Sequence, residues 1–447
     1  MTDIQWEVAR RAPVQGGCTS WDGRVTGDYV TDTFAWYLGI DWGTQQHQFC
    51  LTDGDGQIRD EQTVAHTTDA VYAALHRIRD RTGVPPAAIA VGLETTHGIL
   101  VDTLIEQGFR VFALNPKQLD HFRDRYTAGG AKDDRRDAWV VSDALRNDRR
   151  AFRAIRPDDP SLVPLRELSR MLEELQVQES RLANRLREQL HRVQAAWLTL
   201  SPAATDPWLW AILRDAPHPN AWAQLARRRI APVLREHRIR RLSVDDVIAA
   251  VRQPTLPVAT GVGDAVAIRI ASLVPQLLLI HAQRTATEGQ IDRALHELAQ
   301  GDRPQGQPTE HRDVEILQSL PGVGRVVAAT MLSEASSPLA ERNYPTLRAY
   351  SGVAPITKRS GKRLLVVRMR YACKARLRQA LYHWSRTSIQ HDPPARAYYD
   401  RLRARGQSHG RALRSVGDRW LRILIAMLKT RTLYDADRVT HAEAVPA

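Results

Sequence analysis

Between residues 36 and 114, short apolar stretches alternate with polar turns and with stretches of helical spacing. Apolar runs of this length between turn residues are typical of strands, whereas apolar residues three and four apart indicate helices. A threonine at 67 or 68 can cap the first helix. We expect strands at 37–41, 47–52, 58–64, 88–93 and 109–114, and helices at 68–81, 98–107 and 132–148.

Three strands in hairpins, followed by alternating helices and strands, is the order of a ribonuclease H-like domain. The first strand of that fold lies centrally, so the strands 37–41 and 88–93 would be neighbours. Residues 1–35 show no sustained periodicity and predict a loose extension. We therefore expect an α/β domain at residues 36–150.

A different pattern begins at Leu165, where apolar residues recur at spacings of three and four. These residues are Leu165, Leu168, Leu172, Leu175, Leu182, Leu186 and Val193, and then Ile270, Leu273, Leu277, Ile280, Ile291, Ala294 and Leu298. We expect two long helices in an antiparallel hairpin or an intermolecular coiled coil. The alternative is a helical-bundle core within one chain. Pro275 predicts a kink or a helix start.

Two further segments complete the division of the chain. Residues 201–260, which contain three tryptophans, predict a helical insert, and the polar run 301–309 predicts a linker. The four expected parts are a loose extension (1–35), the α/β domain (36–150), a helical coiled-coil region with its insert (151–305) and a mainly helical C-terminal domain (306–447).

The chain is strongly basic, with a formal net charge of +13 over 447 residues. Such a balance favours a polyanionic partner, and nucleic acid is the leading candidate. Cys18, Cys50 and Cys373 are too scattered for a disulfide framework or a zinc site. No apolar run approaches membrane-spanning length, and the N-terminus lacks a signal-peptide core. We expect a cytoplasmic bacterial protein that associates with the nucleoid.

Acidic residues stand at the ends of two predicted strands, Asp41 after the first and Glu94 after the fourth. In the predicted helix 132–148, Asp137 shares a face with Asp134 and also with Asp133, so spacing alone leaves that choice open. Taken singly, each acid could be a solvated surface carboxylate. Clustered carboxylates raise one another's pKa, and a divalent cation commonly compensates for them. The set predicts a metal site that could cleave a phosphodiester.

Helix, Pro-Gly-Val-Gly (321–324) and helix is the pattern of a helix-hairpin-helix. Gly322 and Gly324 would let backbone N–H groups approach a phosphate. The alternative is a plain turn between two helices.

Residues 342–391 contain no Asp or Glu, which predicts a phosphate-binding surface. The basic residues there are Arg348, Lys358, Arg359, Lys362, Arg363, Arg368, Arg370, Lys374, Arg376, Arg378 and Arg386. Ser360 lies among them and could be a nucleophile; alternatively it is a turn serine or a simple phosphate contact.

Taken together and in order, these residues resemble the DEDD transposases of the insertion-sequence family called "one-one-zero", relatives of the Piv-type DNA invertases. The first block of matches is Gly39-Ile40-Asp41, Leu93-Glu94, Asn115-Pro116 and Lys132-x-Asp134-x-x-Asp137-Ala138. The second block is 321–324, 350–355, Ser360-Gly361, 377–381 and 397–402. The family usually has a small hydroxyl residue at the position of Asp133 and a glycine at that of His97.

The resemblance implies a RuvC-like domain in which Asp41, Glu94, Asp134 and Asp137 hold Mg²⁺, with Mn²⁺ as an alternative. It favours Asp134 over Asp133, and it implies a C-terminal transposase domain whose Ser360 attacks DNA. The implied partners are target and donor DNA, a structured bridge RNA that pairs with both, and further copies of the chain in a dimer or tetramer. Serine and carboxylates would then have to lie close together in space.

Three functions compete at this point. The first is an RNA-guided transposase or recombinase with a phosphoserine intermediate. The second is a RuvC-like junction endonuclease, or a Piv-like invertase, and in the endonuclease water would be the nucleophile. The third is a nucleic-acid-binding protein without catalysis, against which the complete carboxylate set argues.

Overall fold

The computed structural model describes residues 34–95, 98–126, 133–155, 159–300, 312–360 and 363–436. The chain divides into two compact units, Met1–Asp158 and Asp159–Ala447, and each has its own hydrophobic cores. The predicted linker 301–309, and all but the last two residues of the predicted extension 1–35, lie outside the described residues.

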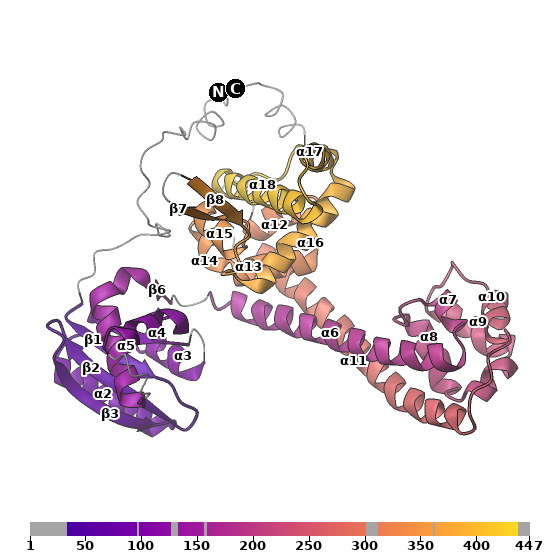
Figure 1. Ribbon diagram of the computed structural model, residues 1–447, viewed down its shortest axis with the longest axis horizontal. Coiled ribbons are helices and arrows are strands. Elements are labelled where there is room, and N and C mark those ends of the chain that lie inside the picture. The colour runs from indigo at the N-terminus through magenta and orange to yellow at the C-terminus, as the bar shows by residue number, and fades with distance from the viewer. Residues whose placement is uncertain are drawn as a thin grey trace. The chain divides into compact units, whose positions relative to one another are not determined.

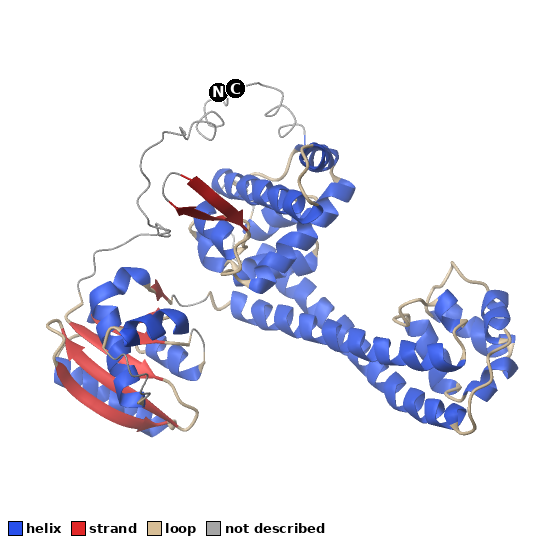
Figure 2. Ribbon diagram, in the orientation of Figure 1, coloured by secondary structure: helices blue, strands red, loops and turns tan. Residues whose placement is uncertain are grey.

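The first unit is built on a six-stranded mixed sheet of order β3-β2-β1-β4-β5-β6 (Figure 1, Figure 2). Strand β1 pairs antiparallel with β2 and parallel with β4, so it is central, as expected. The arrangement is consistent with a ribonuclease H-like domain. The strands are β1 (Trp36–Asp41), β2 (Gln46–Asp53), β3 (Ile58–Ala65), β4 (Ile89–Leu93), β5 (Arg110–Ala113) and β6 (Arg153–Ala154).

Within the described residues, four α-helices cover this sheet: α2 (Thr68–Thr82), α3 (Ile99–Glu106), α4 (Pro116–Asp124) and α5 (Asp134–Asp148). Buried residues of α2 and α3 pack with Leu38 and Ile40 of β1 in one core. Residues of α4 and α5 form a second core with Ala90 and Phe112. Thr67 is the cap of α2. The predicted strands and helices are confirmed to within two residues, whereas α4 and β6 were not predicted.

The second unit contains two long helices, α6 (Leu162–Val193) and α11 (Val262–Gln300), which pack against each other within the chain (Figure 1). Leu165 and Leu172 of α6 share a core with Ile291 and Leu295 of α11, whereas Leu186 clusters with Ile270. The helices are therefore antiparallel. Pro275 lies inside α11, so it does not start a helix.

Between α6 and α11 lies the insert, which is helical as expected. Its helices are α7 (Trp197–Leu200), α8 (Pro207–Asp215), α9 (Arg227–Glu236) and α10 (Val244–Val251). Its core contains Trp197, Trp208, Trp210 and Trp222, and the rings of Trp197 and Trp222 meet edge to face at 5.8 Å. The insert packs on the adjoining ends of α6 and α11.

The C-terminal part is mostly helical and packs on the other ends of α6 and α11. One feature was not predicted, an antiparallel hairpin of two strands within the acid-free segment. The elements are α12 (Asp313–Gln318), α13 (Arg325–Glu334), α14 (Ser336–Ala340), α15 (Tyr344–Tyr350), β7 (Ile356–Ser360), β8 (Arg363–Arg368), α16 (Ala375–His391), α17 (Pro393–Ala404) and α18 (His409–Thr430).

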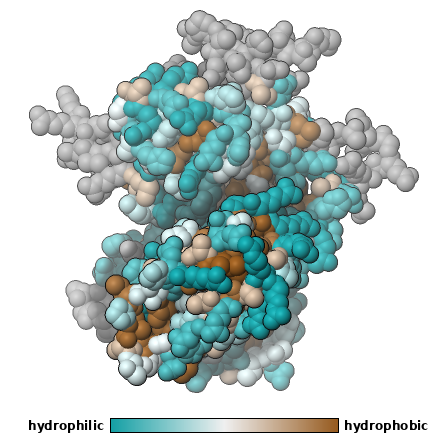
Figure 3. Space-filling view, turned by 90° about the vertical axis from the view of Figure 1, so that its right-hand side faces the viewer, coloured by the Kyte–Doolittle hydropathy of each residue, from teal (hydrophilic) through white to brown (hydrophobic). Residues whose placement is uncertain are grey.

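Helix α11 corrects one expectation from the sequence. By length and composition alone it is apolar enough to cross a membrane, and 28% of the residues in its most apolar 18-residue stretch are buried. The buried positions of that stretch, among them Ile270 and Leu277, belong to the core shared with α6 and the insert. Ile268 and Leu279 of the same stretch are exposed. The space-filling view in Figure 3 shows apolar areas among hydrophilic ones on the face that it displays.

Candidate active site

The two strand-end acids follow the same short pattern, glycine, an apolar residue and the acid. Gly39 is the register partner of Gly92, and Ile40 is that of Leu93, in the parallel pair β1 and β4. Asp41 ends β1, and Glu94 follows directly after β4. Because the strands are parallel neighbours in register, the two carboxylates stand beside each other at one edge of the sheet.

Helix α5 packs directly on the backbone of these two strands. A Cβ atom on Gly39 would lie 1.9 Å from the carbonyl oxygen of Ala138, and one on Gly92 would lie 2.8 Å from Cγ1 of Val141. Only glycine permits so close an approach. The paired glycines of β1 and β4 thus form the floor on which α5 rests.

This packing also sets how α5 aligns with β1. The hydroxyl of Ser142 donates to the carbonyl oxygen of Tyr37 at 3.1 Å, and Gly39 lies against Ala138. Two residues of a strand rise about 6.7 Å, and four residues of a helix rise about 6.0 Å. Contacts between β1 and α5 can therefore recur every two residues along the strand and every four along the helix. Continued by one step, the same alignment would bring Asp41 towards the first turn of α5, which begins at Asp134.

The acids in that turn have different environments. Asp133 is the cap of α5, and its carboxylate accepts from the backbone N–H of Arg135 at 3.3 Å. Asp134, the first helical residue, is exposed, and Asp137 is only 2% exposed. Asp133 thus has a structural role as the cap of α5, which Asp134 does not share. Residue spacing alone could not distinguish the two acids. Acids in a first turn are favoured by the helix dipole.

Arg123, which the sequence reasoning missed, connects two of these acids. Its Nε lies 2.7 Å from Oδ1 of Asp137, and a terminal nitrogen donates to Oδ2 at 2.9 Å and to Oε1 of Glu94 at 3.4 Å. Its other terminal nitrogen donates to Asp120 at 2.7 Å. Burial alone would lower the pKa of Arg123, but its bonds to Asp137 and the charge of Glu94 raise it. The guanidinium is therefore a firmly charged member of the site.

The donor chemistry fits a divalent cation. Carboxylate oxygens are the ligands that Mg²⁺ prefers, and the buried charge of Asp137 requires a cationic partner. In the part of the chain that the structure describes, no three His, Cys, Asp or Glu side chains meet closely enough to hold a metal together. Glu94 and Asp137 are joined through Arg123 instead. His97 lies outside the described residues.

A pair of histidines lies near this edge of the sheet. Nε2 of His47 is 2.8 Å from Nδ1 of His66, and the backbone N–H of Gly43 donates to Nδ1 of His47 at 3.3 Å. Burial, and then the charge of His66, lower the pKa of His47. His47 precedes Gln48, the register partner of Asp41, so the histidine pair lies on the strand next to that acid.

In the C-terminal part, the turn 321–324 joins α12 to α13. Gly322 has φ of +82°, and a Cβ atom there would lie 2.7 Å from the backbone nitrogen of Ser388 in α16. Trp384 donates from its ring nitrogen to the carbonyl oxygen of Pro321 at 3.0 Å. The positive φ and the close approach of α16 therefore explain why residue 322 is a glycine. Gly324, the cap of α13, is exposed, and a Cβ atom there would meet nothing within 4 Å.

Ser360 ends β7 and is the register partner of Arg363 in the hairpin. The structure describes the backbone but not the side chains of 357–360 and 363–368, and Lys362 lies outside the described residues. The proposed roles of Ser360, Lys358, Arg359, Lys362, Arg363 and Arg368 stay predictions.

At least three cations of the acid-free segment are engaged within the protein, and one of them, Arg348, pairs with Asp418 at 2.6 Å. Lys374 Nζ lies 3.7 Å from the carboxylate of Glu334, which is 7% exposed, and donates to the backbone oxygen of the same residue at 2.6 Å. Arg376 pairs with Glu173 of α6 at 2.6 Å and with Glu334 at 3.4 Å. Acids that are distant in sequence thus neutralise part of the positive charge of this segment.

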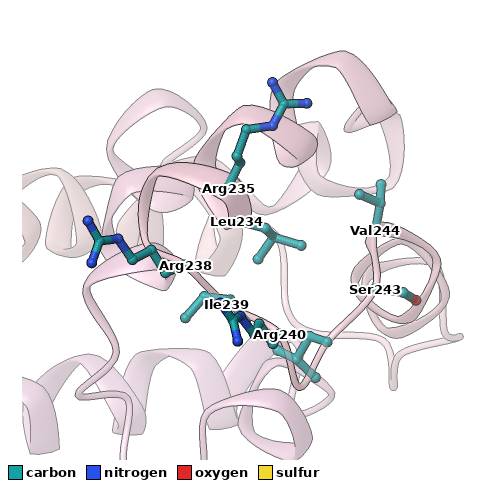
Figure 4. Close-up of a pocket in the computed structure, with 8 residues that line it drawn as sticks. Leu234, Arg235, Arg238, Ile239, Arg240, Ser243 and Val244 are labelled. Atoms are coloured by element: carbon teal, nitrogen blue, oxygen red, sulfur yellow. The ribbon is translucent and has the colours of Figure 1, made fainter.

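Arginines also gather in the insert. A pocket of about 460 Å³ between α9 and α10 has an apolar lining that includes Leu234 and Ile239 (Figure 4). Arg235, Arg238 and Arg240 line it as well, and no acid is among its lining residues. This hollow adds positive surface to a region for which the sequence predicted no role.

Comparison with known proteins defines the class of the chain. Residues 38–194 match the family model of DEDD transposases named after IS110, and residues 314–400 match that of the transposase IS116/IS110/IS902 family. The first match contains the strand-end acids and α5, and the second contains the turn 321–324 and the β7–β8 hairpin. The matched segments are thus those of a two-part transposase.

The chain belongs to the IS110 family of transposases, which confirms the resemblance seen in the sequence. It is 42% identical over 247 residues to the y4uE protein of Sinorhizobium fredii, an alignment that covers 54% of this chain and 69% of that one. It is 27% identical over 414 residues to the 43.6 kDa protein of insertion element IS110 from Streptomyces coelicolor, covering 91% and 97%. The 42 kDa protein of IS900 from Mycobacterium paratuberculosis is 25% identical over 414 residues, covering 91% and 98%.

Proposed function

We propose that this protein is a DNA transposase that cleaves and rejoins target and donor DNA, guided by a structured bridge RNA. One observation supports the proposal most directly: Asp41 and Glu94 stand at neighbouring strand ends, and Glu94 shares Arg123 with Asp137 in the first turn of α5, where Asp134 also lies. Four carboxylates in one RuvC-like domain form a DEDD site for Mg²⁺ or Mn²⁺.

The carboxylates have separate tasks in this proposal. Asp41 and Glu94 supply oxygen ligands from the rigid sheet, and Asp137 supplies a buried one from α5. A bound divalent cation would polarise the phosphodiester and stabilise charge on its oxygens. Placing the ligands on strands and a buried helix keeps them at fixed positions, as metal-assisted chemistry requires.

Ser360 is proposed as the nucleophile. Its Oγ attacks phosphorus and forms a Ser–phosphate bond, while the bond from phosphorus to one deoxyribose oxygen breaks and that oxygen takes up the proton. The phosphodiester energy is conserved in the new bond. A deoxyribose hydroxyl of the other DNA can therefore displace the serine and reseal the strand without ATP. Basic residues around Ser360 would stabilise the phosphoryl oxygens.

Base pairing by RNA would supply sequence specificity, and protein contacts to phosphates would supply affinity. The net charge of +13 supports such a partner. The proposed contacts are Gly324 at the start of α13, the cations of the acid-free segment from Lys358 to Arg378, and the arginines of the insert pocket. Gly322 lies at the same proposed helix-hairpin-helix and would act by shaping the turn.

Paired DNA sites require paired proteins, so we propose a homo-oligomer, a dimer or tetramer. Exposed apolar side chains on the long helices, Ile268 and Leu279 of α11 and Met171 and Val177 of α6, support a coiled-coil contact with another chain. Light scattering that finds a monomer, both alone and with RNA and DNA, would contradict this part.

The experiment that tests the function is to stop a recombination reaction with denaturant and seek a DNA adduct on the peptide that contains Ser360. Ser360→Ala should give neither adduct nor recombinant, and Ser415→Ala, a serine of the same domain, should give both. If Ser360→Ala still cleaves DNA, water is the nucleophile and the junction-endonuclease interpretation replaces this one. A chain that binds DNA but never cleaves it would support the non-catalytic interpretation.

A further inference from the structure

Arg123 has an unusual position for a surface-helix arginine. Its side chain is 27% exposed, and it contacts the carboxylates of Asp137, whose side chain is 3% exposed, and of Glu94, whose side chain is 33% exposed. Both oxygens of Asp137 accept from it, in the bidentate geometry that gives the strongest arginine–carboxylate pairs. Arg123 therefore lies where a cation shared by these two acids would lie.

The third contact of Arg123 is with an exposed carboxylate. Asp120, one turn earlier on α4, accepts from its other terminal nitrogen at 2.7 Å and is 64% exposed. The side chain thus has one set of partners inside the site and one partner at the surface. Asp120 and Arg123 both lie on α4, so their bond does not depend on the contacts that Arg123 makes with Glu94 and Asp137.

We propose that Arg123 is the internal counter-cation of the carboxylate site and leaves Asp137 when a divalent cation binds. This inference rests on the proposed metal-binding role of Glu94 and Asp137. Two cations cannot share one carboxylate pair without strong repulsion, since buried like charges interact through a low dielectric. Until the metal arrives, the guanidinium offsets the repulsion between the acids.

The consequence is a competition that sets metal affinity. Removing the guanidinium charge leaves the acids with an uncompensated negative charge, and sites with greater ligand charge bind divalent cations more tightly. The same removal costs stability, because Asp137 stays buried without a partner. Metal affinity and fold stability should therefore move in opposite directions in Arg123 variants.

The test is a Mn²⁺ titration of the full-length protein at pH 8 without nucleic acid, with free Mn²⁺ measured by electron paramagnetic resonance. Arg123→Gln should bind Mn²⁺ about tenfold more tightly than the wild type while unfolding at a lower temperature. Arg125→Gln is the matched control, since Arg125 lies on the same segment and pairs at 3.4 Å with Asp148, outside the site. It should bind as the wild type does.

Two further variants separate the outcomes. If Arg123→Gln does not fold, Arg123→Lys replaces it; lysine cannot donate to both oxygens of Asp137 in a fixed fork, so Mn²⁺ binding should still tighten, by a smaller factor. Unchanged or weaker binding in the Arg123 variants would overturn this inference. Asp137→Asn should lose Mn²⁺ binding; if it binds like the wild type, the proposed metal site itself is wrong, whatever Arg123 does.

Discussion

The closest backbone approach in the first unit allows a sharp prediction for Gly39→Ala. The added methyl would lie 1.9 Å from the carbonyl oxygen of Ala138 and 2.6 Å from the backbone nitrogen of Ser142. Ordinary contact begins at 3.4 Å, so α5 would have to lift from β1 by at least about 1.5 Å. Both obstacles are backbone atoms of a helix, which cannot rotate out of the way.

The loss of folding stability in three glycine variants can be ranked from the same geometry. Val140, Val141 and Leu145 of α5 are fully buried, so lifting the helix loosens a packed core. Overpacking of this kind costs about 1–3 kcal/mol, and a backbone obstacle places Gly39→Ala at about 3 kcal/mol or above. Gly92→Ala meets side chains, the nearest Cγ1 of Val141 at 2.8 Å, and should cost about 1–2 kcal/mol. Gly54→Ala, whose Cβ would meet only Ala35 at 3.9 Å, is the control and should be near neutral.

The assay is unfolding by guanidinium chloride, followed by Mn²⁺ binding of whichever variants fold. We expect stability to fall in the order Gly54→Ala, Gly92→Ala, Gly39→Ala. We also expect Mn²⁺ affinity to fall with it, because lifting α5 moves Asp134 and Asp137 away from Asp41 and Glu94. A Gly39→Ala protein as stable as the wild type would refute the argument that α5 rests on this glycine floor.

Further predictions concern single groups. Asp41→Asn, Glu94→Gln, Asp134→Asn and Asp137→Asn should each abolish strand cleavage in Mg²⁺ while DNA still binds in a gel-shift assay; full cleavage by two of them would remove the metal assignment. Because burial lowers the pKa of His47 below its usual 6.5, the unfolded chain binds the proton first, so stability present above pH 6.5 is lost as the pH falls towards the folded-state pKa. His47→Gln should flatten that acid limb, and an unchanged limb would mean that other groups cause it. Replacing Arg235, Arg238 and Arg240 by alanine should lower the slope of log affinity against log salt by about one for each phosphate that the protein no longer neutralises, and an unchanged slope would exclude the insert pocket as a binding surface.

The fold of the first unit follows from local signals in the sequence. Alternating and helical spacing located its strands and three of its helices, and the parallel order placed Asp41 beside Glu94. Helix α4 was not predicted because its nine residues are mostly polar and, among those whose side chains the structure describes, Leu119 alone is deeply buried. Two signals could have located it: Pro116 at its first position, and Asp120 three residues before Arg123.

Charge was harder to predict than fold, because ion pairs join residues far apart in sequence. The absence of acids from 342–391 suggested one continuous phosphate-binding surface, yet Lys374 and Arg376 find Glu334 and Glu173. Likewise, Gly322 looked like a phosphate contact, and its closest neighbour is the backbone of α16. A short stretch of sequence shows its own charges and glycines, but it does not show the distant residues that they contact in the folded chain.

The break in the apolar spacing of α6 at Glu179 has a physical role of the same kind. Glu179 is 7% exposed, and its carboxylate lies 3.4 Å from His281 and 3.4 Å from Arg284 of α11. Apolar clusters lie on both sides of this polar layer, one with the C-terminal part and one with the insert. Sliding α6 along α11 would bury Glu179 without these partners, and an unpaired buried carboxylate is strongly destabilising, so the layer favours one register. Because the apolar seams are thus covered within the chain, any interface with a second copy must use the residues that stay exposed, such as Ile268 and Leu279.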